Sequence, residues 1–232
     1  MRIIDFFKGH WQLILLVGAV FVLWRYPFVW PLRMLIVFLH EASHALAVIL
    51  TGGEVLRLSL SPLEGGSVLA RGGNGFITAS AGYLGSLVLG SVLFLLALRT
   101  KADRLIVALL GASMIGLSLF YVRELFPLMF CLGGAAILLF SSKFLGQMIN
   151  DLILRIIGLT SMVYVPYDIF SDTLARSHLR SDARIIAENY GGTTLMWGTL
   201  WLMISLIFIG FIARVALKRP SNISFKSSKP RG

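Results

Sequence analysis

Two histidines and a glutamate stand in the middle of an apolar stretch, residues 34–50. His40 and His44 are four residues apart, so on a helix they share one face, one turn apart, and together can bind a metal ion. Glu41 follows the first histidine and can reach a water molecule on the same ion. This is the HExxH arrangement, and its residue types suit a zinc ion that holds a water molecule.

The same pattern occurs by chance in soluble helices, where hydrogen bonds alone satisfy both histidines. The apolar surroundings argue against chance here. An acidic side chain in the middle of a membrane costs roughly 2.5–3.5 kcal/mol, and a buried polar group without a partner adds to that cost. The stretch therefore predicts a metal site.

A third protein ligand is needed, because catalytic zinc usually has three of them and a water molecule. The candidates are Asp168, Asp172, Asp182, His178, Glu54 and Glu64. Asp168 is preferred, because it closes an apolar segment behind Pro166, which should bend or end the helix and let the side chain turn inward. Asp172, one helical turn further on, is the alternative. Asp182 and His178 lie in a polar stretch where solvation alone explains them.

The composition places these residues in a membrane protein. Of 232 residues, 57% are hydrophobic and 14% are charged, against about 45–50% and about 25% in soluble domains. The net charge of +10 comes from basic residues between the apolar segments and in the tail, where they anchor the topology or meet anionic lipid. No basic patch has interleaved aromatic residues, so no nucleic-acid partner is predicted.

Apolar segments long enough to cross a bilayer core of about 30 Å divide the chain. They predict an all-α membrane protein, a polytopic bundle of about six to seven transmembrane helices with the metal-binding helix at its centre. The predicted spans are residues 11–23, 31–51, 76–98, 105–122, 125–140, 149–170 and 195–217. With seven spans, the two termini would lie on opposite faces of the membrane.

The segment after the metal-binding helix changes its period. Leu56, Leu58 and Leu60 alternate with polar residues, as in a strand, and residues 62–66 have the composition of a turn. This pattern predicts a small β-hairpin at the membrane face, with an ordinary amphipathic loop as the alternative.

Two further stretches complete the organisation of the chain. Residues 79–86 are rich in small side chains, which favours close helix packing. Residues 218–232 are basic and rich in serine and proline, as in a disordered tail. We therefore predict one transmembrane metallopeptidase-like domain, residues 1–217, followed by that tail.

Several segments together resemble the site-2 proteases, a family of intramembrane zinc metallopeptidases, and within it the short B-like branch of bacteria and plastids. The matching segments are LHEASHA (39–45), TGG (51–53), ASAGYLG (79–85), YD (167–168), SDA (181–183) and WG (197–198). The resemblance implies that His40, His44 and Asp168 hold zinc and that Glu41 is the general base. It also implies a membrane-protein or peptide substrate, a surrounding lipid bilayer, and a bacterial cytoplasmic or plastid-type membrane.

Three other interpretations are compatible with the sequence. The first is a catalytically inactive, membrane-embedded binding or chaperone protein with a structural or vestigial metal site. The second is a channel or transporter, which polar residues inside the membrane also suit, although no inverted repeat is apparent. The third is another HExxH class of membrane protease, whose third ligand is a later glutamate. Its candidates, Glu124 and Glu188, lie outside the apolar runs.

Overall fold

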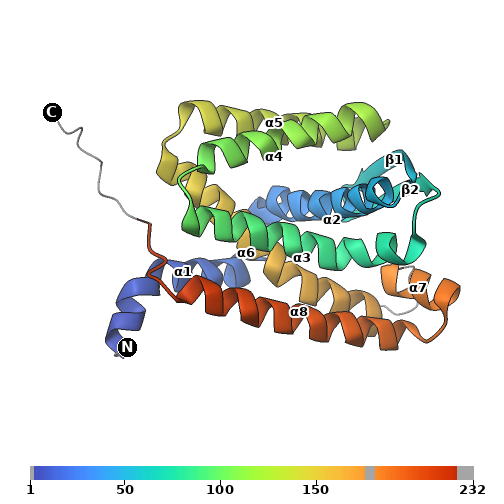
Figure 1. Cartoon of the computed structure of the whole chain (residues 1–232). Coiled ribbons are helices and arrows are strands. Elements are labelled where there is room, and N and C mark those ends of the chain that lie inside the picture. Colours follow the sequence, from blue (N-terminus) through green and yellow to red (C-terminus); the bar gives the residue numbers. More distant parts are fainter. Residues whose placement is uncertain (1–2, 176–180, 224–232) are drawn as a thin grey trace.

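The computed structural model describes residues 3–175 and 181–223 and confirms the predicted helical bundle. Among these residues, seven helices are long and apolar enough to cross a membrane. They are α1 (Ile3–Leu23), α2 (Trp30–Leu50), α3 (Gly75–Arg99), α4 (Asp103–Tyr121), α5 (Leu125–Phe144), α6 (Gln147–Phe170) and α8 (Thr194–Leu217). The short helix α7 (Asp182–Tyr190) and a hairpin of β1 (Glu54–Ser61) and β2 (Gly65–Arg71) lie together at one end of the bundle (Figure 1).

Local signals set the helix ends that matter for the site. Gly52, with φ of 79°, follows the end of α2 in a left-handed conformation that favours glycine. The Asn74 side chain accepts a hydrogen bond from the backbone N–H of Ile77 at 3.0 Å and caps α3. Ser181 caps α7 in the same way through Arg184 N, and this makes Asp182 the first residue of that helix.

Pro166 does not end its helix. α6 runs through it to Phe170 and passes into a π-helical turn, Ser171–Ala175. A proline in a membrane helix is tolerated when its surroundings satisfy the backbone carbonyl that it leaves unpaired. Asp168 therefore belongs to a continuous helix. The expectation that a helix end at Pro166 would let the Asp168 side chain turn inward loses its basis.

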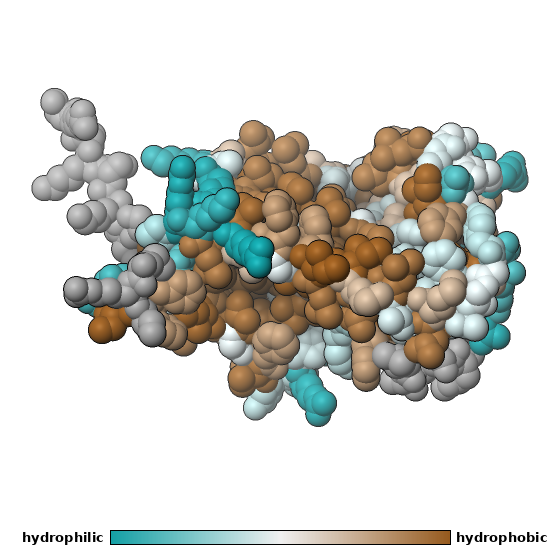
Figure 2. Space-filling view, turned by 60° about the horizontal axis from the view of Figure 1, so that its bottom comes forward, coloured by the Kyte–Doolittle hydropathy of each residue, from teal (hydrophilic) through white to brown (hydrophobic). Residues whose placement is uncertain are grey.

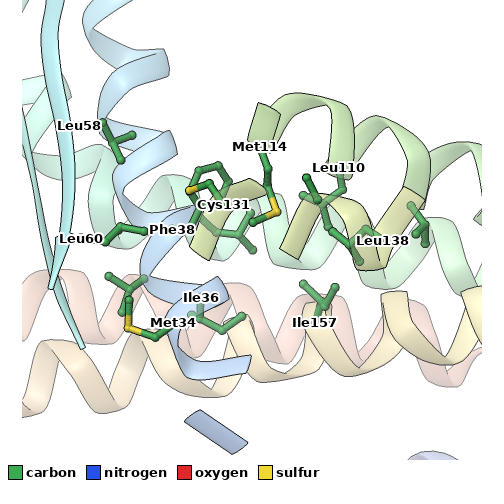
Figure 3. Close-up of a cluster of buried hydrophobic side chains, with 14 of the residues drawn as sticks. Met34, Ile36, Phe38, Leu58, Leu60, Leu110, Met114, Cys131, Leu138 and Ile157 are labelled. Atoms are coloured by element: carbon green, nitrogen blue, oxygen red, sulfur yellow. The ribbon is translucent and has the colours of Figure 1, made fainter. Parts of the chain in front are cut away.

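One of the two large apolar core clusters of the described chain surrounds α2. Figure 3 shows Phe38 of α2 close to Met114 of α4 and Cys131 of α5, and all three belong to one buried apolar cluster. The predicted hairpin is confirmed, and Leu58 and Leu60 of β1 extend its apolar side into this cluster. The hairpin therefore packs into the bundle along α2.

A β-bulge changes which residues of the hairpin are buried. The register shifts between Val55 and Arg57, so Val55 is buried and Leu56 only half-buried. A bulge inserts one unpaired residue and breaks the strict alternation on which the sequence prediction depended.

The two ends of the described chain meet. Ser221 N donates to Gly9 O at 3.0 Å, and His10 Nδ1 lies 2.8 Å from Ser221 Oγ. Figure 1 shows the beginning of α1 and the end of α8 at the same end of the bundle. The expectation that the termini lie on opposite faces is wrong. Seven strictly alternating spans cannot bring these residues together, and α1 is the least buried of the seven.

The first residues of the predicted tail are held in place. Ser221, Asn222 and Ile223 hydrogen-bond to α1, so this part does not fit the predicted disorder. The rest of the tail, residues 224–232, lies outside the described residues.

The surface has the distribution expected of a protein within a bilayer. Figure 2 shows apolar residues over the middle of the molecule and hydrophilic residues gathered mainly toward its two ends. Such an apolar middle suits the hydrocarbon core, and polar ends suit the interfaces. Together with the seven apolar helices, it indicates an integral membrane protein.

Candidate metal centre

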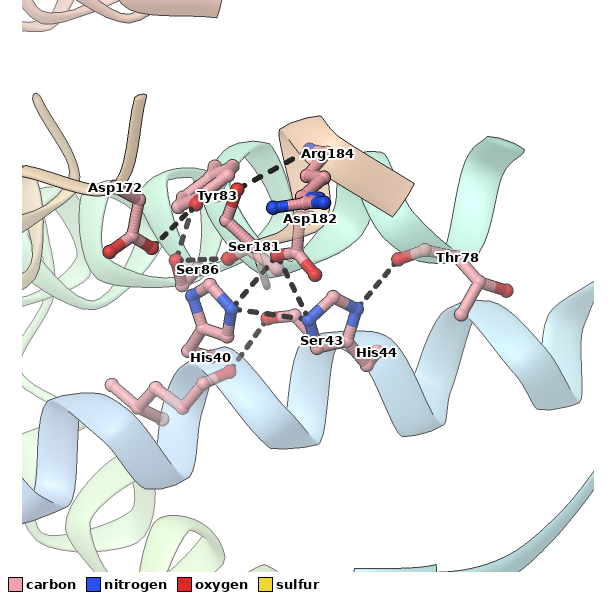
Figure 4. A network of polar contacts seen from close by, with 12 residues as sticks. His40, Ser43, His44, Thr78, Tyr83, Ser86, Asp172, Ser181, Asp182 and Arg184 are labelled. Carbon is pink, nitrogen blue, oxygen red and sulfur yellow. Dashed lines mark hydrogen bonds and ion pairs between the residues drawn. The ribbon is translucent and has the colours of Figure 1, made fainter. Parts of the chain in front are cut away.

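Three potential ligand atoms from two distant parts of the chain converge. His40 Nε2 lies 3.1 Å from Asp182 Oδ2, and His44 Nε2 lies 3.2 Å from the same oxygen. The two Nε2 atoms are 3.1 Å apart. Figure 4 shows the imidazoles projecting from α2 toward the Asp182 carboxylate on α7, with α3 alongside. Three lone-pair atoms at this spacing repel one another unless a proton or a metal ion lies among them.

A backbone carbonyl orients His44. Thr78 O, in the first turns of α3, accepts a hydrogen bond from His44 Nδ1 at 2.7 Å (Figure 4). A carbonyl can only accept, so Nδ1 carries the hydrogen and Nε2 of the neutral ring turns its lone pair toward Asp182. Metal-binding histidines usually donate their second ring N–H to a carbonyl or carboxylate in this way.

Gly82 leaves room for the three ligand atoms. A methyl group placed on it would lie 2.5 Å from Asp182 Oδ2 and closer still to both histidine nitrogens. The sequence assigned this residue to helix packing. Packing is also present one turn later, where a methyl group on Gly85 would lie 2.9 Å from Ser43 Cβ on α2. Small residues on α3 therefore leave room both for the approach of α2 and for the three potential ligand atoms.

Glu41 lies beside this triad and outside it. The residue is 4% exposed, and within the described residues its Oε2 has no hydrogen-bond partner. On the other side it lies against the hairpin, because a methyl group on Gly66 would be 2.5 Å from Glu41 Cγ and Oε1. A buried carboxylate oxygen without a protein partner is costly, and one beside a candidate metal site can accept a proton from a water molecule there.

The structure brings Asp182, and not Asp168 or Asp172, to the two histidines. In the part of the chain that it describes, only His40, His44 and Asp182 form a group compact enough to share an ion. Asp172 instead accepts a 2.8 Å hydrogen bond from the Tyr83 hydroxyl. Asp168 stays on the continuous helix α6.

The remaining candidate ligands lie elsewhere. Glu54 is exposed at the start of β1, and Glu64 pairs with Arg33 at 2.8 Å. Glu124 pairs with Arg57, and Glu188 with Arg184. His178 lies outside the described residues.

The carboxylate of Asp182 is held in its charged form. Burial would raise its pKa, but in the metal-free site protons taken up by the facing imidazoles of His44 and His40 outweigh burial, through charge and hydrogen bonding, and hold the pKa of Asp182 below its ordinary range. The group is therefore ionised at neutral pH, as a metal ligand must be.

The sequence does not favour Asp182 as the third ligand, because its neighbours in the chain are polar. The signal that could have found it is the SDA segment, residues 181–183, in which a helix-capping serine precedes the aspartate. Thr78, Gly82 and Gly66 gave no usable signal, because a backbone carbonyl or the absence of a side chain has no chemical signature in a sequence.

Comparison with known proteins identifies one family. No curated protein and no solved structure matches the chain. A sequence model of one family, described as Peptidase M50B-like, matches residues 13–212, which include all three residues of the triad and Glu41. The chain belongs to the Peptidase M50B-like family.

Proposed function

We propose that this protein is an intramembrane zinc metallopeptidase that hydrolyses peptide bonds of membrane-protein substrates. The observation that carries the proposal is the convergence of His40, His44 and Asp182 beside Glu41, whose Oε2 has no hydrogen-bond partner among the described residues. Membership of a peptidase family supports it. A bacterial cytoplasmic or plastid-type membrane is the proposed location.

The donor set fits zinc. Two imidazole nitrogens and one carboxylate oxygen are the ligands of several catalytic zinc sites. The three atoms form a nearly equilateral triangle with sides of 3.1, 3.1 and 3.2 Å. Ligands about 2.0–2.1 Å from a tetrahedral ion are about 3.3 Å apart, so the triangle has nearly the size that zinc requires.

Each residue has a distinct task in the proposed reaction. Zinc, when bound, lowers the pKa of a water molecule toward about 7 and polarises a peptide carbonyl. Glu41 accepts the water proton through its unpartnered oxygen and delivers it to the leaving amine. His44 keeps its ligand nitrogen aimed by donating to Thr78 O. The low exposure of Glu41 limits competing bulk water.

The hairpin is the proposed substrate-binding element. A helical substrate hides its peptide bonds and must be extended to be cut. β2 is exposed at Gly66, Ser67 and Leu69, and Gly66 adjoins Glu41. An extended substrate that adds to β2 as a further strand would pass close to the general base.

Removal and return of zinc tests the proposal. The purified protein in detergent or vesicles should cleave a membrane-protein substrate, lose this activity to a chelator, and regain it with stoichiometric zinc. Cleavage that persists after zinc is removed would contradict the proposal. Zinc binding without cleavage of any membrane-protein substrate would favour the inactive binding or chaperone protein.

Gly82→Ala should strongly weaken zinc binding, because its methyl group would occupy the space against the three ligand atoms. We expect more than a tenfold loss of affinity in a titration of metal-free protein, in line with the cost of disturbing the supports of a metal site. Gly116→Ala is the matched control, since a methyl group there meets nothing within 4 Å. Equal zinc affinity of Gly82→Ala and native protein would show that the ion does not lie against α3.

A further inference from the structure

An arginine in the apolar span of α2 joins three segments of the chain. Arg33 Nε and Nη2 each lie 2.8 Å from Glu64 Oε1 in the hairpin turn. Arg33 Nη1 donates to Trp24 O at the end of α1 and to Tyr26 O in the following connection. The Arg33 side chain is only 12% exposed. An arginine in a membrane span needs such compensation, so this ion pair is an organised element of the structure.

The partner of this arginine has an unusual backbone. Glu64 has φ of 63° and is the only non-glycine residue with positive φ in the described chain. This conformation costs a residue other than glycine roughly 1–2 kcal/mol, and Gly65 and Gly66 follow it directly. Turn geometry alone would therefore favour a glycine at this position. The side chain of Glu64 offsets the backbone cost through its contact with Arg33.

The turn is also held at a second point. Trp30, almost one helical turn before Arg33 on α2, donates its indole N–H to Pro62 O at 3.0 Å. Within the turn, Glu64 N donates to Ser61 O at 3.1 Å. The hairpin turn is thus fixed to the same helix that carries the HExxH residues.

The ion pair is two residues from the strand position that contacts the general base. Gly66 begins the exposed part of β2 and lies against the side chain of Glu41. Because Glu64 is bound to α2 by Arg33, the start of β2 cannot move away from α2 without breaking that ion pair. Glu41 lies two helical turns beyond Arg33 on α2. One helix therefore carries both the general base and the residue that holds the strand against it.

We propose that Arg33 and Glu64 are positioning residues that hold β2 against Glu41 and so fix the general base for the reaction. This inference rests on the proposed peptidase function. It predicts that breaking the ion pair slows the chemical step and loosens the start of β2, while zinc binding is unchanged, because neither residue contacts the triad.

Glu64→Gly is the decisive variant, since it removes the ion pair and relieves the backbone at the same position. We expect kcat to fall about tenfold or more and KM to rise, because β2 is also the proposed substrate-binding strand, while zinc content stays nearly unchanged. Hydrogen exchange of residues 65–71 should become several-fold faster in both the zinc-loaded and the metal-free protein. Arg33→Gln should have the same effects, although it also loses the bonds to Trp24 and Tyr26.

Arg57→Gln is the matched control, because it breaks the other ion pair of the hairpin, in which Arg57 and Glu124 are half-exposed and 3.5 Å apart. Its kcat and exchange should stay within about twofold of native. A native kcat together with native hydrogen exchange in Glu64→Gly would overturn the inference. Loss of zinc or of the fold in both Glu64→Gly and Arg33→Gln would also overturn it, because the ion pair would then be purely structural. If native protein binds zinc and does not cleave, the proposed function fails, and the exchange experiment still shows whether the ion pair holds β2.

Discussion

Glu41→Gln is expected to abolish peptide cleavage while the zinc stays bound. Glutamine keeps the shape of glutamate but cannot accept a proton, and Glu41 lies outside the ligand triad. Loss of a general base typically costs about 10²–10⁴-fold in rate. The measurement pairs the cleavage rate of purified protein with its zinc content per chain.

The control for this variant is Glu188→Gln on α7, whose glutamate forms an exposed pair with Arg184. It should cleave at the native rate. If Glu41→Gln protein lost its zinc, Glu41 would be a ligand and its assignment as the base would fail. If it cleaved normally, another residue would have to accept the proton.

Asp182→Ala is expected to remove the zinc, and activity with it. The two remaining ligands would be histidines one turn apart on α2, and catalytic zinc sites usually have three protein ligands. Because disturbing a group that merely supports a ligand already costs about 10–100-fold in affinity, loss of the ligand itself should cost at least as much. Zinc affinity of the purified variant, measured by competition with a chelator, is the test.

Asp168→Ala and Asp172→Ala are the comparison variants for the third ligand. Asp172 is bound by Tyr83, and Asp168 lies on α6 outside the triad, so both variants should keep zinc with nearly native affinity. Asp172→Ala leaves the buried Tyr83 hydroxyl without this partner, so we expect it to lower stability. Loss of zinc from Asp168→Ala with retention in Asp182→Ala would return the third ligand to α6.

Local patterns allow about half of the candidate metal centre to be predicted. His40, Glu41 and His44 lie within five residues, so helical periodicity alone puts them together. Asp182 is 142 residues from His40, and it arrives there because α7, which begins at Asp182 after the Ser181 cap, packs against α3 and α8. That placement depends on how α3, α6 and α8 pack, and a single sequence does not encode packing in any local pattern.

The sequence likewise allows part of the fold to be predicted. The apolar segments were long enough to identify all seven candidate spans, and alternation in Leu56, Leu58 and Leu60 identified the hairpin. The direction of α1 was not predictable, because length and hydropathy describe a helix and not its partner. Arg33 was overlooked, because an arginine near the start of an apolar span resembles an ordinary interfacial anchor until Glu64 is seen beside it.

The most direct test of the metal centre is the anomalous scattering of zinc-loaded protein crystals, measured on both sides of the zinc absorption edge. We predict one peak per chain, bounded by His40 Nε2, His44 Nε2 and a carboxylate oxygen of Asp182, each about 2.0–2.2 Å away. Glu41 should be close to this peak without coordinating it. A peak whose carboxylate ligand is Asp168 or Asp172, or zinc-loaded crystals with no peak at the two histidines, would contradict the assignment.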